Sequence, residues 1–225
     1  MLTNKLVRLA GASYLILIIS GIFGMVYVPS VMFNWHDPLQ TMVNFEQNLG
    51  LFRWGITGCL VSFIAFTAMS VLLFVIFNKT NYTLALLLLS VGLVGAAAFL
   101  ANTLSYVEIV SLISSGIEHS VEVAQRILLL SLSFSQGFML IQVLTGVWLI
   151  LFGVLAIQSH LLPSIIGWLL IVSGIINYIT EFVLNFLLTS DSLPTYISIV
   201  GTAGEFIACL WLLILGNFWK QKTQQ

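Results

Sequence analysis

The sequence predicts an all-α fold, a polytopic membrane helical bundle of about six transmembrane helices in one integral membrane domain over residues 1–225. Three observations support this prediction. Of the 225 residues, 60% are hydrophobic and only 7% are charged, whereas ordinary soluble domains carry about 25% charged residues. Apolar runs long enough to cross a bilayer alternate with short polar segments. The Lys and Arg residues gather at a few of these polar segments, which is typical of membrane proteins with a fixed orientation.

Six segments can span a bilayer, which takes roughly 20 apolar residues at about 1.5 Å each. They are residues 10–32, 54–77, 83–107, 136–158, 163–188 and 195–217. The first resembles a signal peptide because Lys5 and Arg8 precede it, but it is longer than the apolar region of a signal peptide, so we expect it to be retained. Ahead of the fourth, we expect residues 127–135 to lie at the membrane interface or to form a kinked extension near Gly137.

The connections after the first and third spans are long and amphipathic. Apolar residues recur at helical spacing in residues 39–49 and 117–128. This pattern predicts an interfacial helix in each connection, either resting on lipid headgroups or acting as a lid.

Basic residues predict the orientation. Two of the seven, Arg53 and Arg126, fall on one side of the predicted membrane. The other five fall on the opposite side: Lys5, Arg8, Lys79, Lys220 and Lys222. The side with more Lys and Arg is normally the cytoplasm. We therefore expect a multi-pass protein of the cell (inner) membrane with both termini cytoplasmic.

Several functional classes lack support in the sequence. A net charge of -1 leaves no basic patch for nucleic acid. Cys59 and Cys209 lie within apolar runs, and the three histidines are widely separated: His36, His119 and His160. These patterns favour neither a metal site nor haem. No glycine-rich phosphate loop is present. We therefore predict no nucleic-acid partner, no cofactor and no metal.

Carboxylates inside the spans are the strongest site candidates, because ionisable residues are costly in hydrocarbon and are usually functional. Glu205 lies about ten residues, hence ~15 Å, from the predicted outer start of the last span. On the fifth span a polar residue recurs at every fourth position, which predicts one stripe with Tyr178 beside it. The stripe consists of Ser173, Asn177, Glu181 and Asn185.

Other spans carry polar residues, mostly in their outer halves. Including these, the candidate ligand-binding residues are Glu205, Glu181, Asn177, Tyr178, Asn102, Gln142, Arg53 and Glu108. If their faces converge, they line an outward-facing polar pocket. Alternatives stay open: the amides could only hydrogen-bond neighbouring helices. Arg53 could extend to the headgroups or pair with Glu181, Glu108 or Glu205. Glu205 itself could be a neutral or paired carboxyl that fixes packing.

A series of different short motifs also extends over nearly the whole chain. They are Arg8-Leu-Ala-Gly11 followed by Tyr14 and Gly21, Leu51-Phe-Arg-Trp-Gly55, Asn81-Tyr-Thr-Leu-Ala-Leu86, Leu162-Pro-Ser-Ile-Ile-Gly-Trp-Leu-Leu170, and Gly204-Glu205 with Leu210-Trp-Leu-Leu213. In order and spacing they resemble the bacterial multi-pass membrane family catalogued as domain of unknown function 4386. The resemblance implies a bacterial membrane protein and supplies no reaction.

The chain departs from that family's pattern in two places. Many relatives carry an acidic residue within span two, where residues 62–67 here have none. Relatives often have a histidine ahead of span four, where this chain has Ser135-Gln136-Gly137. Proton or metal chemistry that relies on those groups is therefore not expected here.

Three functions follow as alternatives. The first is an integral membrane protein that binds or transports a small polar or amphiphilic molecule through the polar pocket. The second is a membrane-embedded enzyme acting on a lipid or isoprenoid with carboxylate acid and base residues. The third is a structural or accessory subunit of a membrane complex. The expected partners are membrane lipids, a small-molecule or lipid ligand, and a second copy of the chain, because six spans are few for a transporter.

Overall fold

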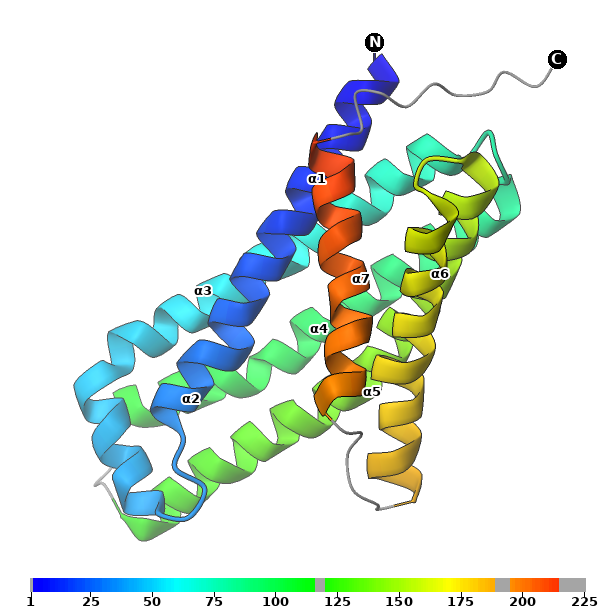
Figure 1. The fold of residues 1–225 in the computed structure, drawn as a ribbon. Coiled ribbons are helices and arrows are strands. Elements are labelled where there is room, and N and C mark those ends of the chain that lie inside the picture. The colour runs from blue at the N-terminus through cyan, green and yellow to red at the C-terminus, as the bar shows by residue number, and fades with distance from the viewer. Residues whose placement is uncertain (1, 116–119, 189–194, 215–225) are drawn as a thin grey trace, which may run out of the picture. The chain divides into compact units, whose positions relative to one another are not determined.

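The computed structural model describes residues 2–115, 120–188 and 195–214 (Figure 1). Within these ranges the chain forms helices joined by short turns, with no strand. Its elements, with η marking π-helices, are α1 Leu2–Gly21, η1 Ile22–Tyr27, α2 Val28–Met32, α3 Pro38–Phe77, α4 Tyr82–Ser114, α5 Val121–Ser159, α6 Ser164–Ser173, η2 Gly174–Thr180, η3 Val183–Leu187 and α7 Thr195–Ile214.

The six predicted spans are each found as helix in the described residues. Five stretches are long and apolar enough to cross a membrane: Asn4–Met32, Pro38–Phe77, Tyr82–Ser114, Val121–Ser159 and Ser164–Phe186. The sixth prediction corresponds to α7, where Thr202–Ile214 forms a shorter apolar helix. Residues 215–217 of that predicted span lie outside the described residues. The predicted all-α membrane bundle of about six helices is therefore confirmed.

The helices α3, α4 and α5 are longer than the predicted spans. They contain 40, 33 and 39 residues. At about 1.5 Å per residue, α3 and α5 approach 60 Å in contour length, roughly twice the hydrocarbon thickness of a bilayer. These helices therefore include the amphipathic connections as well as the apolar spans.

The first predicted interfacial helix is present as the initial part of α3. It begins at Pro38, and the Asp37 carboxylate accepts a hydrogen bond from the Gln40 backbone N–H at 3.0 Å. An acidic cap followed by proline is a common start of a helix. Asn48 has non-helical dihedral angles (φ -130°, ψ 24°), so a kink separates this part from the apolar remainder of α3.

The region ahead of the fourth span forms the first part of α5. Ser120 caps this helix by accepting a hydrogen bond from the Val123 backbone N–H at 3.3 Å. Residues 127–135 then continue into the span as one α-helix. The predicted extension is present, whereas the kink expected near Gly137 is replaced by continuous α-helix. Residues 117–119 of the second expected interfacial helix lie outside the described residues.

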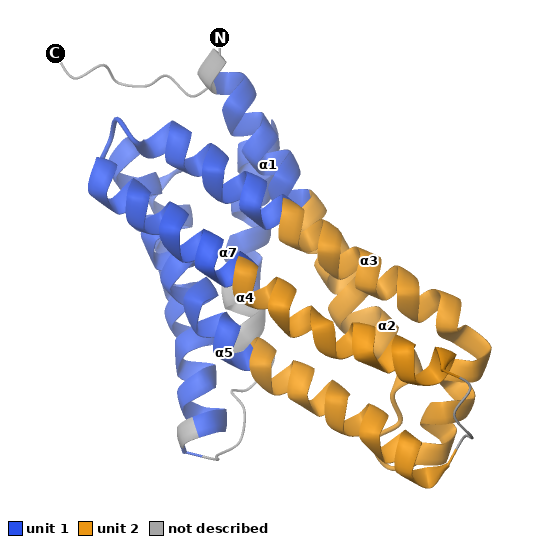
Figure 2. Ribbon diagram, turned by 180° about the vertical axis from the view of Figure 1, so that it is seen from behind, with its two compact units in different colours: residues 1–15, 65–96, 139–225 blue, residues 16–64, 97–138 orange. Residues whose placement is uncertain are grey.

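The chain divides into two compact units (Figure 2). Unit 1 comprises Met1–Leu15, Ala65–Ala96 and Met139–Gln225. Unit 2 comprises Ile16–Ile64 and Ala97–Phe138. The long helices α3, α4 and α5 thus contribute to both, and each unit has its own core.

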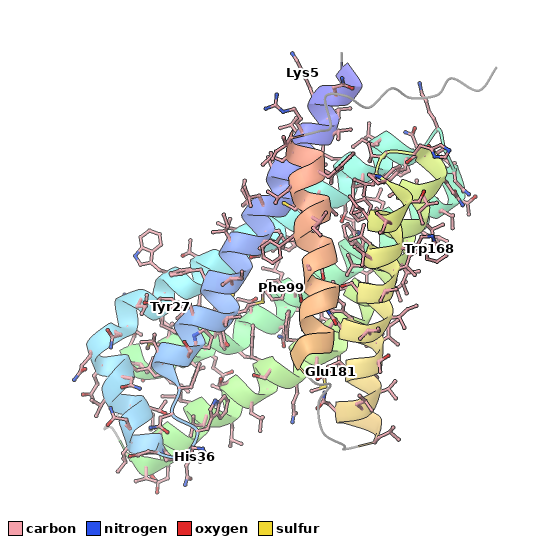
Figure 3. The ribbon with its side chains drawn as sticks, viewed as in Figure 1. Lys5, Tyr27, His36, Phe99, Trp168 and Glu181 are labelled. Carbon is pink, nitrogen blue, oxygen red and sulfur yellow. The ribbon has the colours of Figure 1, made fainter. Side chains whose placement is uncertain are left out.

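Unit 1 packs around large side chains of α3 and α5. Trp148, Phe77 and Phe152 are buried there. The indole N–H of Trp148 donates to Ser70 Oγ at 3.2 Å, which satisfies its polar group inside the core. By contrast, Trp168 of α6 is exposed and projects away from the neighbouring helices (Figure 3).

Unit 2 packs around an aromatic cluster. Its buried rings come from the α2–α3 turn and from α3, α4 and α5: Phe33, Phe45, Phe52, Tyr106 and Phe134. Phe45 and Phe52 meet edge to face with centroids 4.8 Å apart, and Tyr106 stacks on Phe134 at 3.9 Å. Through Phe45, these contacts join the first amphipathic connection to the apolar part of α3.

Candidate functional site

The carboxylate of Glu205 lies among three hydroxyl groups in unit 1. The Tyr14 hydroxyl donates to Oε2 at 3.1 Å. Oε1 accepts two hydrogen bonds, from Ser173 Oγ at 3.0 Å and from the Tyr178 hydroxyl at 2.9 Å. The donors belong to α1, α6 and η2, and Glu205 belongs to α7. We call these four residues the Glu205 cluster.

The cluster lies largely inside the protein. Tyr14 is 2% exposed and Ser173 is 0% exposed. Glu205 and Tyr178 are partly buried. Because hydrogen bonds come to Glu205 from three separate elements, its carboxylate orientation depends on how the helices of unit 1 pack.

A glycine on α1 brings Tyr14 to α7. A Cβ on Gly11 would lie 2.5 Å from the backbone nitrogen of Leu213, so the two helix backbones approach as closely as glycine allows. The Cys209 thiol also donates to the Gly11 carbonyl at 3.6 Å. Tyr14 lies three residues after Gly11 and therefore on a neighbouring part of the same helix face.

A second glycine brings α6 to α7 next to the carboxylate. A Cβ on Gly204 would lie 2.9 Å from Leu169 Cβ and 3.3 Å from the Leu169 carbonyl oxygen. Leu169 lies four residues before Ser173, one helical turn away. The Leu169 carbonyl and Ser173 therefore both lie on the side of α6 that contacts α7.

The π-helix η2 explains how Ser173 and Tyr178 reach the same oxygen atom. In an α-helix, at 100° per residue, side chains five positions apart point about 140° away from each other. A π-helix forms i→i+5 hydrogen bonds, which bring residues five apart onto the same face. Because η2 follows Ser173 immediately, Ser173 and Tyr178 both face Glu205.

Helix α5 supports η2 on another side. A Cβ on Gly146 would lie 2.7 Å from the Gly174 carbonyl oxygen and 2.9 Å from Tyr178 Cβ. A Cβ on Gly174 would in turn lie 2.5 Å from the Gly146 carbonyl oxygen. These close backbone contacts fix the position of Tyr178 relative to α5.

The hydrogen-bond partners of Glu205 are neutral. Among the described residues of unit 1, the basic side chains are Lys5, Arg8, Lys79 and His160, and none of them forms an ion pair with Glu205. A carboxylate offers about four lone-pair sites, of which the hydroxyls use three. The described surroundings can therefore stabilise a negative charge on Glu205 but do not neutralise it. No group of three or more metal-binding side chains occurs in the described residues.

The four residues of the predicted stripe form hydrogen bonds with α7 or with one another. Ser173 faces Glu205, and Asn177 Nδ2 donates to Thr202 Oγ1 of α7 at 3.4 Å. Asn185 Nδ2 donates to the Glu181 carboxylate and carbonyl, each at 2.9 Å. Glu181 follows η2 directly (Figure 3). The change from α- to π-helical geometry alters the period on which the predicted stripe depended.

The remaining predicted site residues fall in different places. Gln142 lies on α5 in unit 1 and is half-buried. In unit 2, Arg53 Nη2 donates to Ser114 Oγ at 3.2 Å, and Asn102 Nδ2 donates to the Phe134 carbonyl at 2.9 Å. Glu108 of unit 2 forms an ion pair with Arg126 at 2.9 Å. The structure thus brings Tyr178 to Glu205 and gives Arg53, Asn102 and Glu108 partners within unit 2.

Sequence reasoning did not place Tyr14 and Ser173 among the ligand-binding residues. Ser173 belonged to the predicted stripe, but its partner across the helix interface was not evident. Tyr14 is a hydroxyl-bearing residue inside an apolar span, three residues after a glycine. A polar group beside a small residue is a common feature of helix contacts in membranes. This pattern is the sequence feature that could have indicated Tyr14.

No curated protein and no solved structure is significantly similar to this chain. A family model described as "Domain of unknown function (DUF4386)" matches residues 9–216, which include all four members of the Glu205 cluster. The chain therefore belongs to this family of proteins, as its sequence motifs predict.

Proposed function

We propose that this membrane protein binds or transports a small polar or amphiphilic molecule that carries a positive charge, and that Glu205 is the recognition group. One observation carries the proposal: a carboxylate within a membrane helix is held by hydroxyls from three other elements, with no basic partner among the described residues. A charged group in hydrocarbon is costly and is rarely kept without a function.

The hydrogen bonds favour binding by fixing the carboxylate before the ligand arrives. Three donors on three elements restrict its rotation, so little conformational freedom remains to be lost on binding. They also leave the charge in place, which a cationic group would neutralise. A ligand with an apolar portion would in addition fit a site surrounded by apolar helices.

The proposal includes a route from one side of the membrane. Thr202, one turn before Glu205 on α7, is exposed and pairs with Asn177. We place this turn of α7 toward the outer side of the inner membrane and both termini in the cytoplasm. Lys5, Arg8 and Lys79, at the beginning of α1 and in the α3–α4 turn, support that orientation through the positive-inside rule. Access to Glu205 would then be from outside, along η2 and α7.

The test uses the full chain in lipid nanodiscs and a matched pair of amphiphiles. Decyltrimethylammonium carries a positive charge, whereas decanol has the same chain length and no charge. We expect the cation to raise the unfolding temperature of the protein, decanol to have less effect, and Glu205→Gln to abolish the difference. Glu122→Gln, which changes an exposed carboxylate at the beginning of α5, is the control and should respond like the parent protein.

Two results would contradict the proposal. One is equal stabilisation by the cation in the parent protein and Glu205→Gln. The other is no response to the cation in either protein, together with reduced abundance of Glu205→Gln in membranes. The second result would favour the structural or accessory-subunit function instead.

A further inference from the structure

We propose that the Glu205 cluster is a proton-exchange site, at which Glu205 releases a proton when a cation binds and takes one up when the cation leaves, with Ser173 reversing its hydrogen bond between the two states. The cation half of this exchange rests on the proposed function. The proton half rests only on the geometry of the cluster.

In one state of the cluster Glu205 is ionised. All three hydroxyls then donate to the carboxylate, which the oxygen–oxygen distances of 2.9–3.1 Å allow. When Glu205 carries a proton, one carboxyl oxygen becomes a donor and one hydroxyl must accept from it. Hydroxyl groups can perform both roles, so the cluster can satisfy either state without moving a helix.

Ser173 is the hydroxyl that reverses its hydrogen bond. A serine in a helix can donate to the carbonyl oxygen four residues earlier. Serines of this chain do so repeatedly, as for Ser90 to Leu86 at 2.8 Å and Ser111 to Val107 at 3.0 Å. For Ser173 that acceptor is the Leu169 carbonyl, which lies beside Gly204 and hence beside Glu205.

In the protonated state the proton lies on Oε1 of Glu205. A proton on Oε1 donates to Ser173 Oγ, whose own hydrogen turns to the Leu169 carbonyl. Tyr178 still donates to Oε1, and Tyr14 still donates to Oε2. Each polar hydrogen of the cluster then has an acceptor. A proton on Oε2 would instead point at the Tyr14 hydroxyl. A tyrosine hydroxyl does not reach the helix carbonyl four residues earlier, as a serine hydroxyl does, so its own hydrogen would have no such acceptor.

The groups that surround Glu205 are weaker acids than a carboxyl group. The titratable groups facing it are Tyr14 from α1 and Tyr178 from η2, with Cys209 one turn later on α7. Tyrosine and cysteine ordinarily lose protons in alkaline solution. Residues 164–173 of α6 and 139–159 of α5 contain no ionisable side chain, and Glu181 lies three residues after Tyr178.

The exchange balances in charge. The protonated carboxyl is neutral, and the cation that displaces the proton leaves a neutral carboxylate–cation pair. One positive charge enters as one leaves. If the protein also opens this site alternately to the two sides of the membrane, the site would support an electroneutral exchange of an organic cation for a proton.

Infrared difference spectroscopy on the full chain in nanodiscs tests the proton half. We expect a carboxylic C=O band that appears on acidification, is absent from Glu205→Gln and is retained in Glu122→Gln. Tyr14→Phe should move the band to higher wavenumber, because the C=O oxygen Oε2 loses its donor. Ser173→Ala should weaken the band at a fixed pH, and Ser173→Thr, which keeps the hydroxyl, should restore it. Absence of a Glu205-dependent band would overturn the proposal.

Adding decyltrimethylammonium to the protonated protein in weak buffer tests the coupling. We expect the band to disappear while protons are released in the same amount as cation bound. A titrating band that the cation leaves unchanged would contradict the proposed cation function and the exchange, while the proton site would stand. Cation binding without any titrating band would support the function and overturn the proton site.

Discussion

The two units hold a carboxylate in opposite ways. In unit 2, Glu108 and Arg126 form an ion pair at 2.9 Å, with 46% and 62% of their side chains exposed. In unit 1, Glu205 has three neutral donors and, among the described residues, no basic partner. An exposed ion pair contributes little to stability and costs little to keep. A carboxylate without a counter-charge in a membrane helix is costly, and this difference is the reason why we propose a function for Glu205.

The largest expected effect comes from the backbone contact behind Tyr178. In Gly146→Ala the new Cβ would lie 2.7 Å from the Gly174 carbonyl and 2.9 Å from Tyr178 Cβ. We expect a loss of about 1–3 kcal/mol of unfolding free energy from overpacking and loss of the cation response, because Tyr178 is displaced. Denaturation of the protein in nanodiscs, with and without decyltrimethylammonium, measures both.

Gly95→Ala is the matched control for that substitution. Gly95 is also a helical glycine of unit 1, but its nearest atoms would lie 3.8 Å from a new Cβ. We expect unchanged stability and an unchanged cation response. If Gly146→Ala behaves like Gly95→Ala, the close contact between α5 and η2 is not what positions Tyr178.

A smaller effect is expected from a helix contact in unit 2. Asn102 donates to the Phe134 carbonyl and connects α4 with α5. Hydrogen bonds between membrane helices contribute about 0.6–2 kcal/mol, so Asn102→Ala should lower the unfolding free energy by about 1 kcal/mol. Its cation response should remain. A lost response would show that the Glu205 cluster depends on unit 2, which the contrast between the units does not predict.

The spans were predictable because they depend on composition and length. The predicted inner limits, residues 77, 83 and 158, lie within one residue of the ends of α3, α4 and α5. On the outer side, the same three predicted spans stop before α3, α4 and α5 do. Hydropathy marks where apolar residues stop, whereas a capped amphipathic helix continues beyond that point.

The candidate site was only partly predictable. Glu205 was evident because a carboxylate in an apolar run is rare. Its partners were not, because one sequence does not state which helix faces meet. Ser173 and Tyr178 converge through η2, and the α-helical period assumed for residues 173–185 has no place for a π-helical segment. Tyr14 reaches the site through a contact between α1 and α7, which are nearly 200 residues apart.

Two tyrosines within the Glu205 cluster donate to the same carboxylate. Tyr14→Phe and Tyr178→Phe each remove one donor to Glu205. We expect each to lower the unfolding free energy by about 0.5–1 kcal/mol. Because both donate to one carboxylate, the double variant should deviate from the sum of the two. Strict additivity in this double-mutant cycle would contradict a shared acceptor.

The smallest effect is expected for the exposed ion pair of unit 2. Arg126→Ala removes the partner of Glu108, yet both side chains are largely in contact with the surroundings. Pairs of this kind contribute less than about 1 kcal/mol, and salt screens them over a distance of about 8–10 Å. We therefore expect a small loss of stability at low salt that vanishes at high salt, with no change in the cation response. A large loss that persists in salt would mean that this pair is desolvated in the membrane. Both units would then hold a carboxylate in hydrocarbon, and the units would differ only in the partner, which is Arg126 for Glu108 and three hydroxyls for Glu205.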